Sequence, residues 1–394
     1  MRTSTRFYVA ALVVWAVLAL SGSRVIPGAV AVIVAAVLAA LAFLSDFRRV
    51  RWPVWAVLFA GLTLASVLWS QDTEVARDAA AALVVVTLTA GVPAAYMDRD
   101  RFLHWLNLAF KTALVASLAA GVLLPSFGVE SRWPNVGALT GLFVHKNLLG
   151  SVLVLGIITL IYTQRKRLWL WLGLYAVGVV MTRSSTAVVL AVVAVLLWWL
   201  LGALGRRGDR DRRLGVLAAA AGLVVLSIIV LQFQVELLDV VGRDLTLGGR
   251  ARMWDAIVTV WGAEPALGYG WGSAFSPQST SAVEIASVMG WVVPSAHSGY
   301  LSVLLQLGVV GLAVFAVFVL QTAGRAFRGF VATPTPFTMW ALQITVAYVI
   351  MNVFDTRVDG LEWFLFVAAA AYMLQVKRRQ PDTTARVPAT RQTA

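Results

Sequence analysis

The stretch that organises the rest of the sequence runs from Thr246 to Gly311, and it includes most of the longest connection between bilayer-length apolar segments. It begins TLGGRARMWDAIVTVWGAEPALGYGWGSAF (246–275), continues through a polar passage and closes on AHSGYLSVLLQLGVVGL (296–312). Two arginines, a histidine and the densest run of glycines lie within it. The sequence on either side reads mostly as helices that cross a membrane.

The composition excludes a soluble domain. Of the 394 residues, 60% are hydrophobic and only 13% are charged, with a mean hydropathy of +0.83. A soluble protein carries about 25% charged residues, so the chain is predicted to be a polytopic membrane protein. It contains no cysteine, which excludes disulfides and thiolate metal sites. The net charge of +13 follows the membrane topology and does not indicate nucleic acid binding.

Apolar runs of about 20 residues predict an all-α bundle of about 12 transmembrane helices. The bundle forms a single domain over residues 1–376, and the long loop, 235–297, is inserted between helices nine and ten. The candidate helices are 7–22, 25–44, 53–70, 77–97, 102–124, 147–164, 168–182, 185–204, 213–234, 298–320, 337–354 and 360–376.

The long loop is predicted to contain amphipathic helices. Trp254, Ile257, Val258 and Trp261 recur at helical spacing and indicate such a helix over 250–262.

Basic residues alternate along the connections and set the orientation. Every second connection is rich in Arg and Lys, as in 48–51 and 206–213, so the positive-inside rule places both termini in the cytoplasm and the 235–297 loop outside. The first apolar segment lacks a small-residue cleavage site, which predicts a retained helix. The tail, 377–394, is polar and proline-containing and is expected to be a disordered cytoplasmic segment.

Counting helices brings several basic residues to the outer face. Arg250 follows two glycines at a helix start, where free backbone N–H groups and the helix dipole favour an anion. A guanidinium there suits a bidentate grip on phosphate oxygens, although an arginine beside a membrane also snorkels to lipid headgroups. Arg252 has the simpler alternative of pairing with Asp255 across one helical turn.

His297 lies where the polar loop becomes a helix, and histidine is suited to accept a proton near neutral pH. Alternatively, His297 only caps the helix that follows it. His145 and Lys146 are either interfacial anchors or ligand-binding residues. The same two alternatives apply to Arg183, which lies in a short turn between two helices. Loop carboxylates, such as those of Asp255, Glu264 and Glu284, have no spacing typical of a metal site, so we expect no metal.

Four segments resemble the O-antigen ligase and polymerase superfamily, especially its exopolysaccharide-polymerase-like branch. They are LASVLWSQDTEVARDA (64–79), GLFVHKNLLG (141–150), GGRARMWDAIVTVWGAEPALGYGWGSAF (248–275) and AHSGYLSVLLQLGVVGL (296–312). One departure concerns Ser184-Ser185-Thr186, where many members carry a basic residue before Thr-Ala.

The resemblance implies a GT-C-like membrane glycosyltransferase that needs neither metal nor cofactor. Such an enzyme moves a glycan from a polyprenyl-diphosphate-linked donor to a hydroxyl of a glycan or lipid acceptor, on the outer face of the cytoplasmic membrane. It makes Arg250 and His297 the catalytic residues, as diphosphate ligand and base. The residues implied to bind substrate are His145, Lys146, Arg183 and Arg252.

Two other classes stay open: a transporter or flippase of lipid-linked glycans, and a non-catalytic component of an envelope assembly complex. Transporters are typically built from paired repeats with ionisable residues at the bilayer midplane, whereas here most of those residues lie at the outer rim. The expected partners are the lipid-linked donor, the acceptor and membrane lipids. The sequence leaves the oligomeric state and the choice between ligase and polymerase open.

Overall fold

The computed structural model describes residues 51–131, 135–232 and 247–375, and every regular element among them is a helix. The segments 7–22 and 25–44 and the tail, 377–394, lie outside the described residues. The longer helices are α3 (Val54–Ala65), α4 (Thr73–Ala90), α6 (Arg99–Leu123), α8 (Lys146–Thr163), α9 (Leu168–Met181), α10 (Ser185–Gly205), α11 (Asp209–Gln232), α13 (Leu247–Trp261), α14 (Thr280–Met289), α15 (Gly299–Ala332), α16 (Pro336–Phe354) and α17 (Leu361–Leu374). Short elements are η2 (Ser66–Leu68), α5 (Val92–Tyr96), α7 (Pro125–Gly128) and η3 (Ser273–Phe275).

Six segments of the described chain are long and apolar enough to cross a bilayer, and the protein is a multi-pass membrane protein. They are Thr73–Tyr96, Arg99–Leu123, Lys146–Thr163, Ser185–Gly205, Gly299–Ala332 and Pro336–Phe354. Three shorter apolar helices, Val54–Leu68, Leu168–Met181 and Leu361–Leu374, accompany them. The all-α class is confirmed, and the count of about 12 spans stays a prediction.

The helix ends follow from local chemistry. Ser184 caps α10 by accepting a hydrogen bond from the Ala187 N–H, and Thr335 and Thr338 form a reciprocal capping box ahead of α16. α15 runs to Ala332 and not to residue 320 as expected. The added residues, QTAGRAFRGFVA, bury Phe330 and Val331 while carrying two arginines, a mixture that the search for apolar runs excluded.

α17 forms the centre of the bundle. Each residue from Leu361 to Tyr372 is buried, including Glu362, so this helix contacts protein on all sides. Its aromatic residues pack closely against α16, as where the rings of Tyr348 and Phe366 stack 4.2 Å apart. A carboxylate in such a setting needs a partner, and that partner belongs to the site described below.

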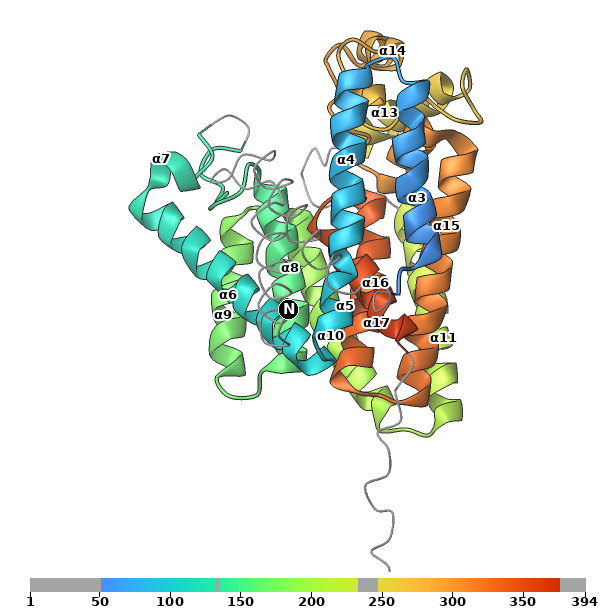
Figure 1. Ribbon diagram of the computed structural model, residues 1–394. Helices are drawn as coiled ribbons and strands as arrows, with labels where there is room; N and C mark the ends of the chain where they lie inside the picture. The colour runs from blue at the N-terminus through green and yellow to red at the C-terminus, as the bar shows by residue number, and fades with distance from the viewer. Residues whose placement is uncertain (1–50, 132–134, 233–246, 376–394) are drawn as a thin grey trace, which may run out of the picture.

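α13 and α14 lie together at one end of the bundle, above α3, α4 and α15 (Figure 1). α13 covers the amphipathic helix predicted at 250–262, and it buries Met253, Ile257 and Val260. Val258, which the spacing placed on the same face, is 44% exposed. The residues that follow are bonded to the corner between α3 and α4, where Asp72 receives hydrogen bonds from the Ser276 hydroxyl and the Val75 N–H.

α15 is interrupted at Gly308, where the loop after α13 crosses it. Gly308 has φ 62° and ψ −163°, and the N–H of Val309 donates to the Pro265 carbonyl rather than within the helix. In the opposite direction, the N–H of Gly270 in the loop donates to the Gln306 carbonyl of α15 at 2.9 Å. The crossing backbone thus satisfies groups that the break leaves open, as burial in an apolar environment demands.

A side chain at this crossing is expected to destabilise the protein. A Cβ at position 308 would lie 2.1 Å from the Ala266 carbonyl oxygen, and the backbone conformation, which is almost exclusive to glycine, costs an L-residue about 1–3 kcal/mol. Gly308→Ala should therefore lower the thermal unfolding midpoint in detergent micelles, followed by tryptophan fluorescence. Gly202→Ala is the control, because nothing lies within 4 Å of a Cβ there, and its midpoint should not fall. Equal midpoints for the two variants would contradict the tight crossing.

Candidate functional site

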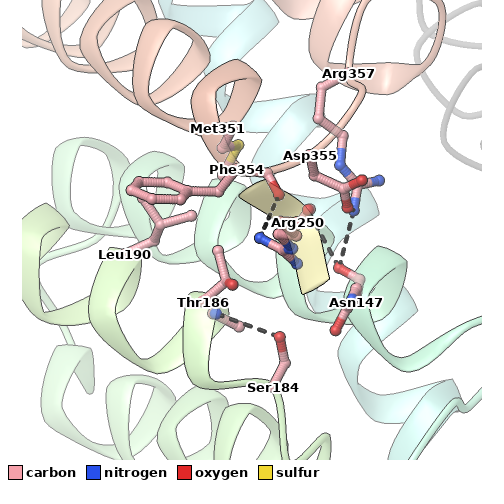
Figure 2. Close-up of a pocket in the computed structure, with 11 residues that line it drawn as sticks. Asn147, Ser184, Thr186, Leu190, Arg250, Met351, Phe354, Asp355 and Arg357 are labelled. Atoms are coloured by element: carbon pink, nitrogen blue, oxygen red, sulfur yellow. Dashed lines mark hydrogen bonds and ion pairs between the residues drawn. The ribbon is translucent and has the colours of Figure 1, made fainter. Parts of the chain in front are cut away.

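A polar pocket of about 350 Å³, including its open mouth, lies where α8, α10, α13 and α16 meet. Its charged lining residues are Arg250, Asp355 and Arg357, and the polar ones are Asn147, Ser151, Ser184 and Thr186. Figure 2 shows Arg250 extending into the middle of this group, between Asn147, Asp355 and Thr186. The pocket therefore joins segments that are more than 200 residues apart in the sequence.

Three helices begin at this pocket, which makes it electropositive. Asn147 is in the first turn of α8, Ser184 and Thr186 begin α10, and Arg250 is in the first turn of α13. The first N–H groups of a helix have no partner within it, and the helix dipole concentrates positive charge there. Converging helix starts suit an anion before any side chain is considered.

Arg250 adds a guanidinium that forms no ion pair with a carboxylate of the described residues. Its Nη1 donates to the Phe354 carbonyl at the end of α16 at 3.2 Å, a bond that orients the side chain without neutralising it. Among the described residues, no carboxylate lies within ion-pair distance of Arg250. The group is half-buried and lines the pocket, so its charge is available to a bound anion.

His297 joins the pocket through Asp355. Its Nδ1 lies 3.5 Å from Asp355 Oδ1, and its side chain is 34% exposed. The residue has φ 46°, a left-handed conformation that costs a non-glycine residue about 1–2 kcal/mol. The surroundings hold it there: the Ala296 carbonyl accepts from Trp254 Nε1 of α13 at 2.9 Å, and Gly299 N–H donates to the Asp355 carbonyl. Arg250 and His297 are thus parts of one site.

The position after Ser298 requires a glycine, because Gly299 lies too close to Asn352 to carry a side chain. A Cβ at this position would lie 1.9 Å from Asn352 Oδ1, and that oxygen accepts the Arg357 N–H. The close approach lets α15 begin directly against the end of α16.

Arg357 is the second guanidinium of the pocket, and it is buried. It contacts Asp355 Oδ2 at 2.7 Å, Glu362 Oε1 at 3.7 Å and the Asn147 carbonyl at 3.4 Å. Burial alone would lower the pKa of Arg357, but the carboxylates of Glu362 and Asp355 raise it above its ordinary value. Its Nε has no hydrogen-bond partner, so one donor of this cation stays unsatisfied.

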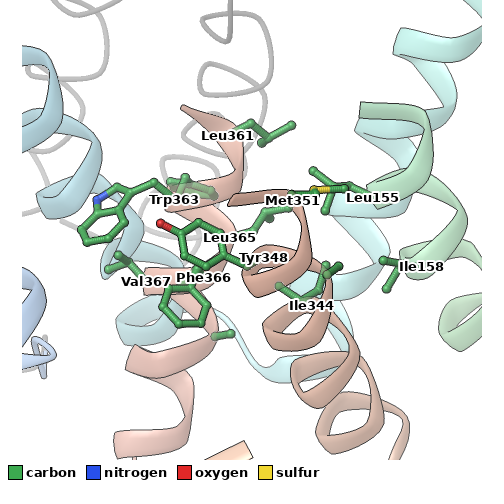
Figure 3. Close-up of a cluster of buried hydrophobic side chains, with 14 of the residues drawn as sticks. Leu155, Ile158, Ile344, Tyr348, Met351, Leu361, Trp363, Leu365, Phe366 and Val367 are labelled. Atoms are coloured by element: carbon green, nitrogen blue, oxygen red, sulfur yellow. The ribbon is translucent and has the colours of Figure 1, made fainter. Parts of the chain in front are cut away.

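Asp355 is shared between the histidine and this arginine. Burial opposes its ionisation, but the hydrogen bond with His297 and the charge of Arg357 outweigh that effect and lower the pKa of Asp355 to about 2. The turn that carries both residues rests on the apolar cluster at the centre of the bundle, where Met351, Leu361 and Trp363 pack together (Figure 3). The charged groups are thereby held by a rigid support.

Residues 172–316 match the family model described as O-antigen ligase. The predicted O-antigen ligase and polymerase superfamily is thereby confirmed. A search of curated proteins gives no match to the chain.

The O-antigen ligase region contains Arg183, Arg250 and His297, whereas Asp355 and Arg357 lie beyond its end. The match over residues 172–316 supports an O-antigen ligase or polymerase-like function in general. The assignment of individual residues to the site is based on their geometry alone.

The site residues predicted from the sequence do not all reach the pocket. His145 caps α8 by accepting the Asn147 N–H on Nδ1, and burial and then the charge of Lys146 lower the pKa of His145. Lys146 Nζ lies 3.4 Å from the Arg183 carbonyl, at the rim. The Arg183 guanidinium turns to the Val136 carbonyl, and Arg252 donates to the Val288 carbonyl of α14 instead of pairing with Asp255.

Arg183 does not line the pocket beside the start of α10. Uncharged Ser184 and Thr186 line the pocket there, and Arg183 Nη1 lies 2.8 Å from the Val136 carbonyl oxygen. Its φ of 51° places it in the left-handed region, like His297. The second guanidinium of the pocket comes from Arg357, which the sequence pattern did not single out.

Among the described residues, no three His, Asp or Glu side chains converge as a metal ion requires. Metal independence stays a prediction.

Replacing Asp355 should change the acid sensitivity of the protein. Its pKa falls from 3.8 to about 2 on folding, so the ionised carboxylate stabilises the folded state at neutral pH by about 2 kcal/mol. That stability is lost only as the pH falls from about 4 through about 2. Asp355→Asn should lower the unfolding midpoint at pH 7 and flatten its decline below pH 4. Asp78→Asn, at a side chain 72% exposed, should leave the profile unchanged. Parallel profiles for wild type and Asp355→Asn would contradict the shift.

Proposed function

We propose that the protein is a glycosyltransferase that transfers a glycan from a polyprenyl-diphosphate-linked donor to a hydroxyl of an acceptor glycan or lipid. The observation that carries the proposal is the convergence of three helix starts, Arg250 and Arg357 beside a histidine that is paired with a carboxylate. The cations suit a departing diphosphate, and the His297–Asp355 pair suits a base. The O-antigen ligase match supports the reaction class.

In the proposed step the acceptor oxygen attacks the anomeric carbon of the donor sugar as the bond from that carbon to the diphosphate oxygen breaks. His297 receives the hydroxyl proton on Nε2, because Nδ1 faces Asp355. The Asp355 carboxylate then stabilises the imidazolium that forms, as an aspartate does beside a catalytic histidine. The polyprenyl diphosphate leaves with the electron pair of the broken bond.

Arg250 and the helix starts would hold that negative charge. The Phe354 carbonyl occupies one donor of Arg250 and leaves the others for phosphate oxygens. Arg357 contributes its unpartnered Nε and a positive field, while its pairs with Asp355 and Glu362 keep it in place. Lys146 at the rim, together with His145, would guide the donor's charged headgroup inward.

The positive-inside pattern puts this end of the bundle on the outer face of the cytoplasmic membrane, where lipid-linked glycans are to be joined to their acceptors. Ligase and polymerase would use this same site and differ in the acceptor that reaches His297.

His297→Asn is expected to abolish transfer. Asparagine tolerates the left-handed backbone at this position but cannot accept the proton, so the rate should fall by about 10²–10⁴-fold while donor binding persists. The measurement is product formation by purified protein with lipid-linked donor and acceptor. His104→Asn, at an exposed ring on α6, is the matched control and should retain wild-type turnover. Unchanged turnover in His297→Asn would remove the base assignment, and translocation of donor across vesicles without product would favour a flippase.

Arg250 and Arg252 offer a paired test within one helical turn. Arg250 lines the pocket and Arg252 turns to Val288, so Arg250→Ala should weaken donor binding by at least about tenfold and Arg252→Ala by much less. Arg250→Lys should restore little, because an ammonium cannot make the bidentate contact. Titration of the donor against each variant measures the difference, and equal losses would argue against a specific phosphate contact at Arg250.

A further inference from the structure

A group of cations lies at the end of α8 opposite the polar pocket. α8 begins beside the pocket at Lys146 and ends at Thr163, and its 18 residues span about 27 Å, close to the thickness of a hydrocarbon core. The connection to α9 that follows reads QRKR (164–167), and its three basic residues are exposed. The positive-inside pattern predicts that this end faces the cytoplasm. These cations are therefore separate from the candidate functional site.

Lys111 brings a fourth cation to this connection from the middle of α6. Its ammonium donates to the Gln164 side-chain oxygen and lies 4.5 Å from the centre of the Trp171 ring. Gln164 in turn donates to the Lys166 carbonyl at 2.7 Å, which ties the lysine to the loop. Because α6, α8 and α9 pack together on one side of the bundle (Figure 1), the ammonium is fixed next to the exposed basic residues.

No carboxylate of the described residues lies within ion-pair distance of Lys111 or of the loop. Residues 131–208, which include α8, α9 and α10, contain no Asp or Glu. Within α6, Asp100 is the single carboxylate, and it lies about 17 Å along the helix from Lys111. A glutamine oxygen and an aromatic face orient an ammonium but do not neutralise it. Since a charge in a membrane-spanning helix is costly unless it is paired, this site favours an anion from outside the chain.

Other basic connections of the described chain carry their own negative charges. Residues 98–101 and 206–213 each contain two aspartates, and Arg101, for example, pairs with Asp98 at 3.2 Å. The α8–α9 connection therefore differs from the general excess of positive charge that the positive-inside rule produces.

Exposed apolar side chains place these cations at the level of lipid headgroups. Trp169 and Leu170, directly after the loop, are 75% and 58% exposed, and tryptophan is enriched where hydrocarbon meets headgroups. On α6, Leu108 and Val115 lie one turn to either side of Lys111, and both are exposed. A ligand that fits this surface has an anionic group at the loop and hydrocarbon along α6 and α9, which describes a phospholipid.

We infer that Lys111 and the basic α8–α9 connection bind the headgroup of an anionic phospholipid in the leaflet opposite the polar pocket. The lipid phosphate would accept hydrogen bonds from the Lys111 ammonium, which has two donors besides the one that Gln164 uses, and from the loop guanidinium groups. The bound lipid would hold α6 to the hairpin of α8 and α9. The inference is independent of the proposed function, because neither donor nor acceptor takes part in it.

Native mass spectrometry of the full-length protein tests the inference. The probe is dioleoyl phosphatidylglycerol, compared with zwitterionic dioleoyl phosphatidylcholine, and each is added to delipidated protein in detergent. We expect the wild type to prefer phosphatidylglycerol, and Lys111→Gln to bind it about fivefold more weakly or worse, as the loss of one charge near a headgroup predicts. Lys111→Arg keeps the charge beside Trp171 and should retain most of the affinity.

Two results would overturn the inference at this stage. One is equal retention of the two lipids by the wild type. The other is displacement of phosphatidylglycerol by inorganic phosphate but not by sodium chloride of the same ionic strength, because the site would then bind a free anion and not a lipid.

Variants of exposed cations separate a specific site from general attraction. Lys166→Gln should also weaken binding about fivefold, and it keeps the inference testable if Lys111→Gln does not fold, because the Lys166 side chain is exposed. Arg210→Gln is the matched control: it removes an exposed cation from the connection after α10, which lies at the same end of the bundle, and should leave the affinity unchanged. Equal losses in Lys166→Gln and Arg210→Gln would contradict a site at the α8–α9 connection.

Discussion

The site depends on the ion pairs that the buried Arg357 guanidinium makes with Asp355 and Glu362. The guanidinium enters a largely apolar region, and its charge is tolerated there because Asp355 and Glu362 lie on either side of it. In turn it fixes Asp355 against His297, closes the turn between α16 and α17, and holds that turn to the start of α8 through the Asn147 carbonyl. One buried cation thereby sets the relative positions of Asp355, His297 and two helix ends.

Much of the fold could be predicted from the sequence, because a transmembrane helix leaves a continuous local signal. Apolar runs located α8, α9, α10 and α16 to within a residue or two. The extension of α15 beyond residue 320 was missed because its last turns mix arginine with buried phenylalanine, a pattern that length and hydropathy do not mark as membrane-spanning. The contact between the loop at 265–270 and the break at Gly308 was also beyond reach, because a backbone-to-backbone crossing leaves no side-chain pattern.

The site was only partly predictable, for a similar reason. Arg250 and His297 stood out through their positions beside helix starts, and the structure places Arg250 in the pocket and His297 against Asp355, which lines it. Asp355 and Arg357 form the other half, yet they lie in a six-residue turn whose composition is ordinary, and only the packing of α16 on α17 reveals their burial. Arg183 and Arg252 show the converse, since both have suitable chemistry, yet each guanidinium is used on a nearby carbonyl. The 64–79 segment proves structural: its Asp72 and Ser66 hold the loop between α13 and α14 to the bundle.

The late position of Arg357 in the sequence has a consequence for biosynthesis. A ribosome completes α8, α10, α13 and the histidine segment well before it reaches the turn that carries Asp355 and Arg357, so a nascent chain has the mouth of the pocket without its anchor. His297 lacks its carboxylate until that turn has been threaded beside α8. Under the proposed function, a nascent chain would therefore lack a complete site until the hairpin of α16 and α17 has been inserted.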